Sequence, residues 1–399
     1  MKELSNVACS VEPSATLAVD TLAKKLKSEG EDVVGFGAGE PDFETPDNIK
    51  EAGIRAIHEG KTRYTPAAGM KELREACAYR LKQDFDLDYD YKQIVIASGA
   101  KHVLYTALTA LINPGDEVII PAPYWVSYYE MVRMVSGHPV IIRTKEAKNF
   151  KITAEQLEDA ITDKTKVFML NNPSNPTGML YSREELQALA DVCVKHDIYI
   201  ISDEIYYCLV YDNKEFTSMA SLGPEVKQHT IVVNGVSKAY AMTGWRIGYA
   251  AANPEIAGVM ANLLSHSASA PSTISQVAAT EALKGPQDTV EAMRKVFEER
   301  RNYIVERMNQ IDGVSCIKPD GAFYIMMNIK KLFGRKIGGR LINNADDFAY
   351  AFLDKARVAV VPCTAFGTSS FVRWTYATSM ENIKKGLDRL EEFLKGAQE

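Results

Sequence analysis

Short apolar runs alternate with segments of helical periodicity through the middle of the chain. Residues 100–112 carry apolar side chains at helical spacing. Residues 183–196 follow Ser182, which has the spacing of a capping box with Glu185. Such alternation is typical of an α/β fold with a mostly parallel sheet. The expected strands are 93–98, 117–121, 139–143, 166–170, 198–202, 230–233 and 247–251.

The pattern changes near residue 286. A long, charge-rich helix is expected at 291–311, followed by short strands at 322–328 and 358–361 and a last helix from Met380. A chain of 399 residues exceeds the size at which one hydrophobic core keeps growing, which favours two domains. The sequence predicts an N-terminal arm with part of a small domain at 1–45, a large domain at 46–285 and a small C-terminal domain at 286–399.

Composition and charge narrow the functional classes. A hydrophobic share of 46% and a charged share of 25% are those of a folded globular chain, so disorder is not expected. The net charge of −6, with Lys and Arg dispersed, argues against a nucleic-acid partner. Six separated cysteines have neither paired nor zinc-ligand spacing, so free buried thiols and no metal site are expected. Without a signal-peptide core or a run of ~20 apolar residues, we expect a cytoplasmic chain with no membrane partner.

Polar residues follow several of the expected strands. In open α/β sheets, ligands bind outside the carboxyl ends of the strands. Gly99, Ala100 and Lys101 lead from a strand into a helix, where free backbone N–H groups and the helix dipole suit a phosphate. The loop 171–178 carries three asparagines among prolines and a glycine. A plain turn explains the prolines and the glycine, but it explains the asparagines less well.

Two further expected strands are followed by residues that could take part in catalysis. Asp203 follows a strand that should be buried, with Tyr206 shortly after; it is a candidate buried carboxylate or, alternatively, a helix N-cap. Lys238 lies in a loop of small residues, with Arg246 eight positions on. It is either an ordinary solvated lysine or an amine activated for a carbonyl partner. The glycines of 34–42 lack dinucleotide-binding spacing, so a Rossmann site is rejected there.

Five segments resemble a known family across essentially the whole chain. They are AGEPDF at 38–43, PYWVSY at 123–128, NPSNPTG at 172–178, SDEIY at 202–206 and SKAYAMTGWRIG at 237–248. The chain is similar to the class I and II aminotransferases of the aspartate aminotransferase fold, and especially to the bacterial aspartate/prephenate aminotransferases. The resemblance implies an enzyme of fold type I that depends on pyridoxal 5'-phosphate. The large domain would bind this cofactor.

The resemblance assigns roles to the catalytic centre. Lys238 would carry the cofactor as a Schiff base and later move the proton between substrate and cofactor. Asp203 would pair with the pyridinium nitrogen, while Tyr206 and Asn175 would bind the phenolic oxygen of the ring. Trp125 would stack on the ring face.

The resemblance also implies how the phosphate is held. It would bind the backbone at Gly99, Ala100 and Lys101, the hydroxyl of Ser237 and the guanidinium of Arg246. Tyr64 matches a tyrosine that reaches the phosphate from the partner subunit. A homodimer with shared active sites follows from that match.

Substrate specificity rests on fewer residues. Arg373 matches the arginine that grips the substrate α-carboxylate, with help from Asn175 and the Gly39 backbone. Ser14, Thr16 and Lys101 match positions that receive an acidic side chain, so aspartate is the expected donor and 2-oxoglutarate the expected acceptor, in a ping-pong reaction. Glu12 stands where relatives that use prephenate often carry a basic residue, which argues against prephenate.

Other interpretations of the sequence retain the fold but assign a different reaction. C–S lyases, decarboxylases and aminotransferases of aromatic or broad specificity share the same lysine. A non-catalytic ligand-sensing domain of a transcription regulator is a further alternative, although the chain carries no basic N-terminal DNA-binding module. The family likeness also predicts cis peptide bonds at Ala122–Pro123 and Asn175–Pro176, a geometry found in about 5% of bonds before proline.

Overall fold

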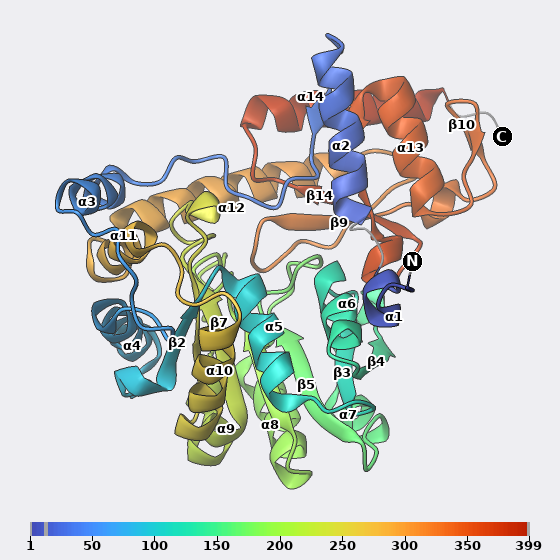
Figure 1. The fold of residues 1–399 in the computed structure, drawn as a ribbon. Helices are drawn as coiled ribbons and strands as arrows, with labels where there is room; N and C mark the ends of the chain where they lie inside the picture. The colour runs from blue at the N-terminus through green and yellow to red at the C-terminus, as the bar shows by residue number, and fades with distance from the viewer. Residues whose placement is uncertain (1, 12–14, 397–399) are drawn as a thin grey trace.

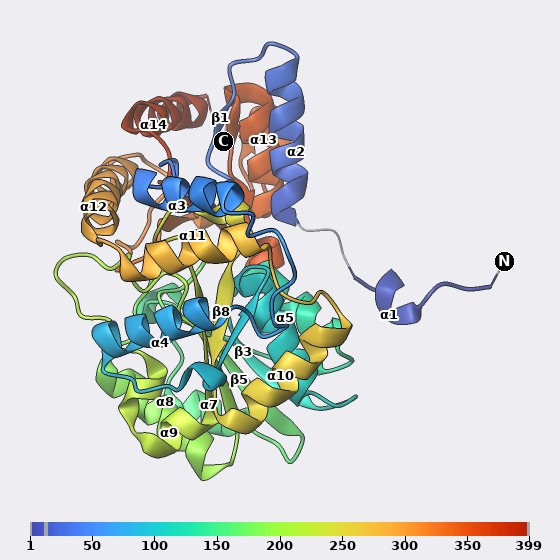
Figure 2. The same ribbon diagram turned by 60° about the vertical axis from the view of Figure 1, so that its left-hand side comes forward.

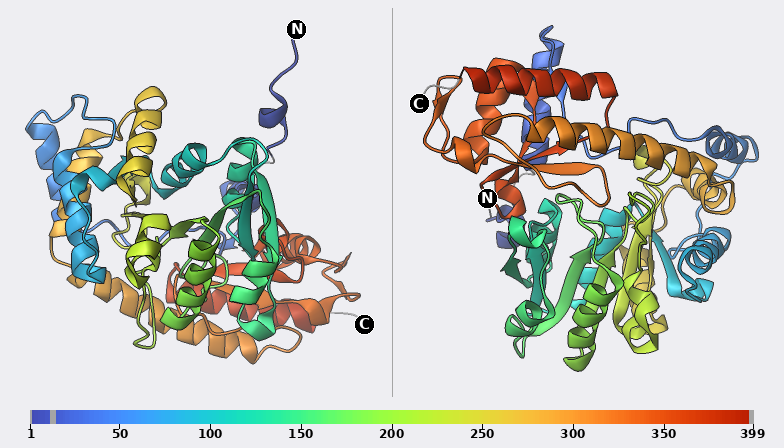
Figure 3. Two further views of the ribbon diagram at one scale, coloured as in Figure 1. Left: turned by 90° about the horizontal axis from the view of Figure 1, so that it is seen from below. Right: turned by 180° about the vertical axis from the view of Figure 1, so that it is seen from behind.

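The protein is described by a computed structural model that covers residues 2–11 and 15–396. It consists of two packed bodies, which we name by their sheets: a central-sheet body and a small-sheet body (Figure 1). Helix α12 (Asp288–Asn309) runs along the boundary between them, as Figures 1 and 3 show. Within the described residues, no helix is both long and apolar enough to cross a bilayer.

The central sheet confirms the expected mostly parallel α/β fold. Its seven strands pair in parallel except for β8, which runs antiparallel to both of its neighbours. All seven predicted strands are present, with ends that differ by one or two residues. In spatial order they are β2 (Ile94–Ala97), β8 (Gly248–Ala251), β7 (Thr230–Gly235), β6 (Tyr199–Asp203), β5 (Thr165–Asn171), β3 (Glu117–Ala122) and β4 (His138–Arg143).

Both faces of this sheet are covered, which explains its continuous apolar runs. On β7, Val233 packs with the core under α5 and α10, while neighbouring Val232 packs with the core under α4 and α11. The predicted capping box of Ser182 and Glu185 starts α8. Figure 2 shows these layers edge-on. The helices of this body are α3 (Asp47–His58), α4 (Lys71–Phe85), α5 (Ala100–Leu111), α6 (Val126–Met134), α7 (Ala154–Asp159), α8 (Arg183–Lys195), α9 (Pro224–His229), α10 (Pro254–His266) and α11 (Thr273–Lys284).

The small-sheet body is built around an antiparallel sheet of β13 (Val361–Pro362), β14 (Phe371–Thr375) and β9 (Tyr324–Asn328). The predicted strand at 358–361 is corrected to two strands in different sheets. β12 (Val358–Ala359) pairs in parallel with β1 (Val34–Gly35), and β13 pairs with β14, because the chain passes from one sheet to the other at Val360. The remaining elements are α2 (Ala15–Ser28), α13 (Ala345–Ala356), α14 (Met380–Lys395) and the hairpin β10 (Lys336–Ile337) and β11 (Arg340–Leu341).

Two local predictions are also confirmed. The peptide bonds Ala122–Pro123 and Asn175–Pro176 are cis, and Asn172–Pro173 is a third cis bond that was not predicted. Helix α1 (Asn6–Cys9) projects from the body (Figure 2) and lies near α6 (Figure 1).

Candidate active site

A cavity of about 330 Å³ opens at the carboxyl ends of the central strands, between the two bodies. This is the place where an open α/β sheet binds ligands. Eleven of the predicted site residues line the cavity: Gly39, Ala100, Lys101, Trp125, Asn175, Asp203, Tyr206, Ser237, Lys238, Arg246 and Arg373. Residues separated by more than 300 positions in the sequence therefore meet in one site.

The amine at the centre of this cavity belongs to Lys238. The residue follows β7, and its Nζ donates a hydrogen bond of 2.6 Å to the carbonyl of Gly39. Burial lowers the pKa of Lys238 to about 8, and the positive charges of Arg246 and Arg373 act in the same direction. A large fraction of this amine is neutral near pH 8, so it can attack a carbonyl carbon. The reading of Lys238 as an ordinary solvated lysine is wrong.

Asp203 is the last residue of β6 and is buried. The hydroxyl of Tyr128 donates to its Oδ2 at 2.5 Å, and the N–H of Ile205 donates to its Oδ1 at 3.2 Å. Burial raises the pKa of Asp203 to about 6, against these donors, which lower it. Asp203 caps no helix, because the next helical turn along the described chain begins at Met219. It is a carboxylate prepared to pair with a positive group in the cavity.

Arg373 points into the cavity from β14 and is almost fully buried. Its Nη1 donates to Oδ1 of Asn175 at 3.0 Å, and its Nη2 donates to the carbonyl of Gly37 at 2.9 Å. The predicted Gly39 backbone instead accepts from Lys238. Nε of Arg373 is buried and has no partner within the described chain. Arg373 lines the cavity, and a guanidinium is suited to a carboxylate ligand.

Two tyrosines stand beside Arg373. The hydroxyls of Tyr206 and Tyr324 are 2.9 Å apart, and the Tyr324 ring lies 4.4 Å from the guanidinium of Arg373. Burial raises the pKa of Tyr206 well above its ordinary value, so its hydroxyl stays neutral and can donate.

The start of α5 forms an anion-binding end of the cavity. Gly99 precedes this 12-residue helix with a φ of +83°, and a Cβ there would collide with the guanidinium of Arg246. A Cβ on Gly248 would collide with the backbone of Ala100. Two glycines thus allow Arg246 and free helix N–H groups to converge, which favours a phosphate. Arg246 itself adopts a left-handed φ of +58°, and its side-chain Nη1 donates to the Thr243 carbonyl.

Lys101 and Trp125 form the rim on this side. Nζ of Lys101 lies 4.9 Å from the centre of the Trp125 ring. Partial burial, together with the charge of Arg246, lowers the pKa of Lys101. Trp125 meets Tyr128 edge to face with ring centroids 5.4 Å apart, so its plane is fixed toward the cavity.

Four predicted site residues remain. Gly99 directly precedes α5 and is not among the residues that line the cavity. Tyr64 is fully exposed and does not line the cavity. Ser14 lies outside the described residues, as does the side chain of Thr16. Glu12, on which the argument about prephenate rests, also lies outside them.

Sequence reasoning gave no role to several residues of the cavity. They are Gly37, Tyr128, Asn171, Ile205 and Tyr324. Tyr128 lies within the PYWVSY segment, three residues after Trp125, which puts both on one face at the start of α6. That spacing could have identified it.

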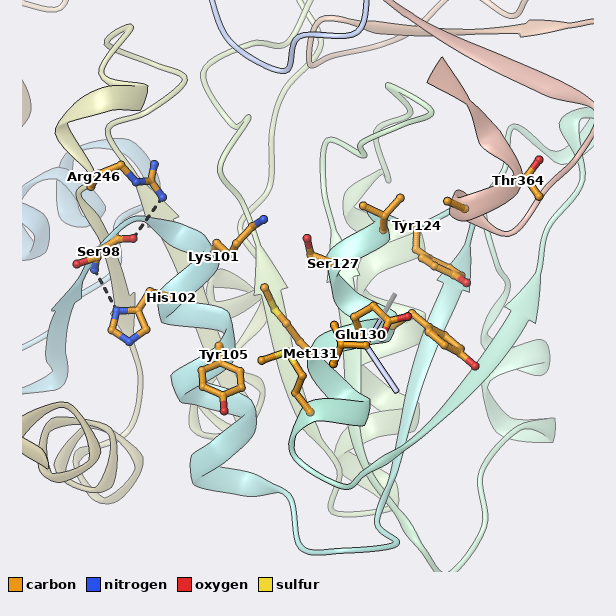
Figure 4. Close-up of a pocket in the computed structure, with 15 residues that line it drawn as sticks. Ser98, Lys101, His102, Tyr105, Tyr124, Ser127, Glu130, Met131, Arg246 and Thr364 are labelled. Carbon is orange, nitrogen blue, oxygen red and sulfur yellow. Dashed lines mark hydrogen bonds between the residues drawn. The ribbon is translucent and has the colours of Figure 1, made fainter. Parts of the chain in front are cut away.

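A second cavity of about 650 Å³ adjoins the first and shares Lys101 and Arg246 with it. Figure 4 shows its walls, which are formed mainly by α5 and α6 and carry apolar side chains such as Tyr105 and Met131. At the end nearer the first cavity, Arg246 donates a hydrogen bond to the Ser98 carbonyl, and the Ser98 N–H donates one to His102 (Figure 4). The anion-binding end is thus open toward a large apolar hollow.

The sequence profile of a protein family, aminotransferase class I and II, matches residues 31–390. The chain belongs to this family. It is 49% identical to an aspartate aminotransferase of Bacillus sp. (strain YM-2) over 99% of this chain and 100% of the relative. It is 46% identical to an asparagine–oxo-acid transaminase of Streptococcus mutans, over 99% of this chain and 100% of the relative. This protein is therefore an aminotransferase.

Solved structures agree with this family and with fold type I. An aspartate aminotransferase from Rhizobium meliloti superposes with a TM-score of 0.96 at 41% identity, with all of both chains covered. The Thermus thermophilus aspartate aminotransferase with maleate gives a TM-score of 0.92 at 40% identity, covering 98% of this aminotransferase and 100% of that chain.

Proposed function

We propose that this aminotransferase uses pyridoxal 5'-phosphate to transfer the amino group of aspartate to 2-oxoglutarate. The single observation that carries the proposal is the half-buried amine of Lys238, whose pKa is lowered to about 8, in one cavity with a buried carboxylate and an anion-binding helix start. Each of these three features suits one group of the cofactor: the amine suits the aldehyde, the carboxylate suits the ring nitrogen, and the helix start suits the phosphate. The residues present therefore fit the group.

When bound, the cofactor supplies an electron-withdrawing ring next to the substrate Cα. Lys238 would hold it covalently and would then serve as the base that moves a proton at Cα. Asp203, kept in place by Tyr128 and the Ile205 N–H, would keep the ring nitrogen protonated. Arg246, Ser237 and the start of α5 would hold the phosphate.

Arg373 and Lys101 support a dicarboxylate substrate. Arg373, which lines the cavity, would take the α-carboxylate, while Asn175 and Gly37 fix its guanidinium plane. Lys101, on the rim beside Trp125, would take the distal carboxylate. The Thermus thermophilus relative was solved with maleate, a dicarboxylate, which is consistent with two cations in one cavity.

Asparagine is the second candidate donor, because the Streptococcus mutans relative is named as an asparagine–oxo-acid transaminase. The two donors differ only at the distal group, which Lys101 would face. A cation there favours the carboxylate of aspartate over the amide of asparagine by a charge-assisted hydrogen bond.

We also propose a homodimer in which the second copy supplies Tyr64. The tyrosine is fully exposed, an unusual environment for an aromatic side chain, and the hollow of Figure 4 exposes apolar side chains beside Arg246. A second copy seated over this hollow would cover the apolar surface and bring a hydroxyl to the phosphate.

The test is donor selectivity in the purified enzyme and in Lys101→Ala. A charge-assisted hydrogen bond contributes roughly 1.5–3 kcal/mol, so kcat/KM for aspartate should fall about 10- to 100-fold. Turnover of phenylalanine should stay nearly the same. Equal losses for both donors, or a wild-type preference for aromatic donors, would contradict the aspartate assignment. Release of ammonia or pyruvate without a 2-oxo acid would instead indicate a lyase.

A further inference from the structure

A third cavity, of about 600 Å³, lies between the two bodies, and Ala122 and Pro123 at the end of β3 form part of its wall. The central-sheet body contributes the end of β4 and the residues after it. The small-sheet body contributes the end of β9 and the segment 364–371. No role in the proposed reaction falls to this cavity.

Three direct contacts between the bodies surround it. Nδ2 of Asn328 donates to Oε2 of Glu146 at 2.6 Å, and the Tyr124 N–H donates to the Phe366 carbonyl at 3.1 Å. The rings of Phe150 and Phe371 meet edge to face with centroids 5.3 Å apart. A ligand in this cavity would therefore touch both bodies at their junction.

The charges of the cavity are unbalanced. Arg143, Lys145 and Lys330 line it, and none of these side chains has a hydrogen bond or ion pair within residues 2–11 and 15–396. The one carboxylate in its lining, Glu146, is already engaged by Asn328. Three cations against one carboxylate leave two positive charges, although the protein as a whole is negative. Unpaired cations around a hollow attract an anion.

The neutral part of the lining points to the type of anion. Thr368, Ser369 and Ser370 line the wall from the small-sheet body, and hydroxyl and backbone N–H groups are frequent partners of phosphate oxygens. A guanidinium matches the same oxygens in a bidentate manner. A phosphate dianion carries the charge that would neutralise the excess. The volume exceeds that of free phosphate and falls within the range of sites for small organic ligands.

We propose that this junction cavity is a second ligand site, which binds a small phosphomonoester. Its phosphate bridges Arg143 and Lys145 of one body and Lys330 of the other. Because β14, which carries Arg373, starts at the wall of the cavity, the ligand also stabilises the position of the substrate-binding arginine relative to Asn175.

Isothermal calorimetry on the full chain, purified with its cofactor bound, tests the site. The cofactor occupies the active-site phosphate subsite, so glucose 6-phosphate serves as the probe for the junction cavity. Glucose tests the need for the phosphate, and citrate tests carboxylates as the alternative. We expect saturable binding of glucose 6-phosphate, weaker binding of citrate and none of glucose.

Variants assign the binding to the cavity. Arg143→Ala and Lys330→Ala should each weaken binding roughly tenfold or more, since each removes a charged hydrogen-bond donor. Lys336→Ala on the β10 hairpin removes the same charge from an exposed position outside the lining and should leave affinity unchanged. Absence of saturable binding to the wild type, or unchanged affinity in both cavity variants, would overturn the site. Loss only in Arg143→Ala would overturn the bridge, and tighter binding of citrate would overturn the phosphomonoester assignment.

Discussion

The hydrogen bond from Tyr128 to Asp203 should set the acid limit of activity. Both groups are buried, and the oxygen atoms are 2.5 Å apart. Burial raises the pKa of Asp203, and Tyr128 opposes this rise because it donates to the charged form of the carboxyl; the net pKa is about 6. Hydrogen bonds to charged groups contribute roughly 1.5–3 kcal/mol, and one pKa unit corresponds to about 1.4 kcal/mol. Tyr128→Phe should therefore raise the pKa of Asp203 by roughly one to two units.

The assay is the pH dependence of kcat/KM for aspartate together with cofactor affinity. Only charged Asp203 can hold a protonated ring nitrogen, so in Tyr128→Phe the acid limb should move to higher pH while activity at pH 8 to 9 changes less. Tyr199→Phe removes a hydroxyl at the opposite end of β6 and should leave the profile unchanged. A loss in Tyr128→Phe that is uniform across pH would indicate only a structural defect and would refute the reasoning.

Three more predictions concern the cofactor and the subunit partner. Borohydride reduction of the purified enzyme should fix the cofactor on Lys238, as peptide mapping would show, and recovery on another lysine would be inconsistent with the site. Gly99→Ala should weaken cofactor affinity, measured by dialysis, because the added Cβ at φ +83° collides with Arg246. Gly60→Ala is the control, because its φ of +69° is similar but open space surrounds the added Cβ. Mixing inactive Lys238→Ala with Tyr64→Ala should restore about a quarter of wild-type activity, since each hybrid dimer would hold one intact site; no recovery after subunit exchange would argue against the shared site.

The sequence predicted the elements of the central sheet because their signals are local. Strand β5 and helix α8, for example, are marked by a continuous apolar run and by a capping box. The candidate site residues Lys238 and Asp203 were predictable because each lies at, or within three residues of, the end of such a strand. The break between β12 and β13 at Val360 was not predictable, because both short strands and the residue between them are buried and apolar.

The residues that sequence reasoning missed are defined by partners far along the chain. Tyr128 is 75 positions from Asp203, and Tyr324 is 118 positions from Tyr206. A local sequence pattern predicts only that Tyr128 and Tyr324 are core aromatics, and their burial is equally consistent with that role. The same limit applies to the junction cavity, where Arg143 and Lys330 become neighbours only through the packing of two bodies.

A last prediction concerns Glu204, which follows Asp203 and is completely buried. Its Oε1 accepts from the hydroxyls of Ser202 and Ser218 and from the Met219 N–H, whereas its Oε2 has no partner within the described chain. Burial raises the pKa of Glu204 to about 7 from an ordinary value of 4.5. The folded state thus binds a proton that the unfolded chain has released, so the free energy of unfolding falls as pH rises between these two pKa values and levels off above them.

The difference between the two pKa values corresponds to a fall of about 3 kcal/mol in the free energy of unfolding. Glu204→Gln removes this dependence, so its stability relative to wild type should improve by about that amount between pH 4.5 and pH 8, measured by urea unfolding. Asp203 contributes its own dependence to both proteins, which therefore cancels in the comparison. A stability difference that stays constant across this range would show that Glu204 is charged in the folded protein throughout.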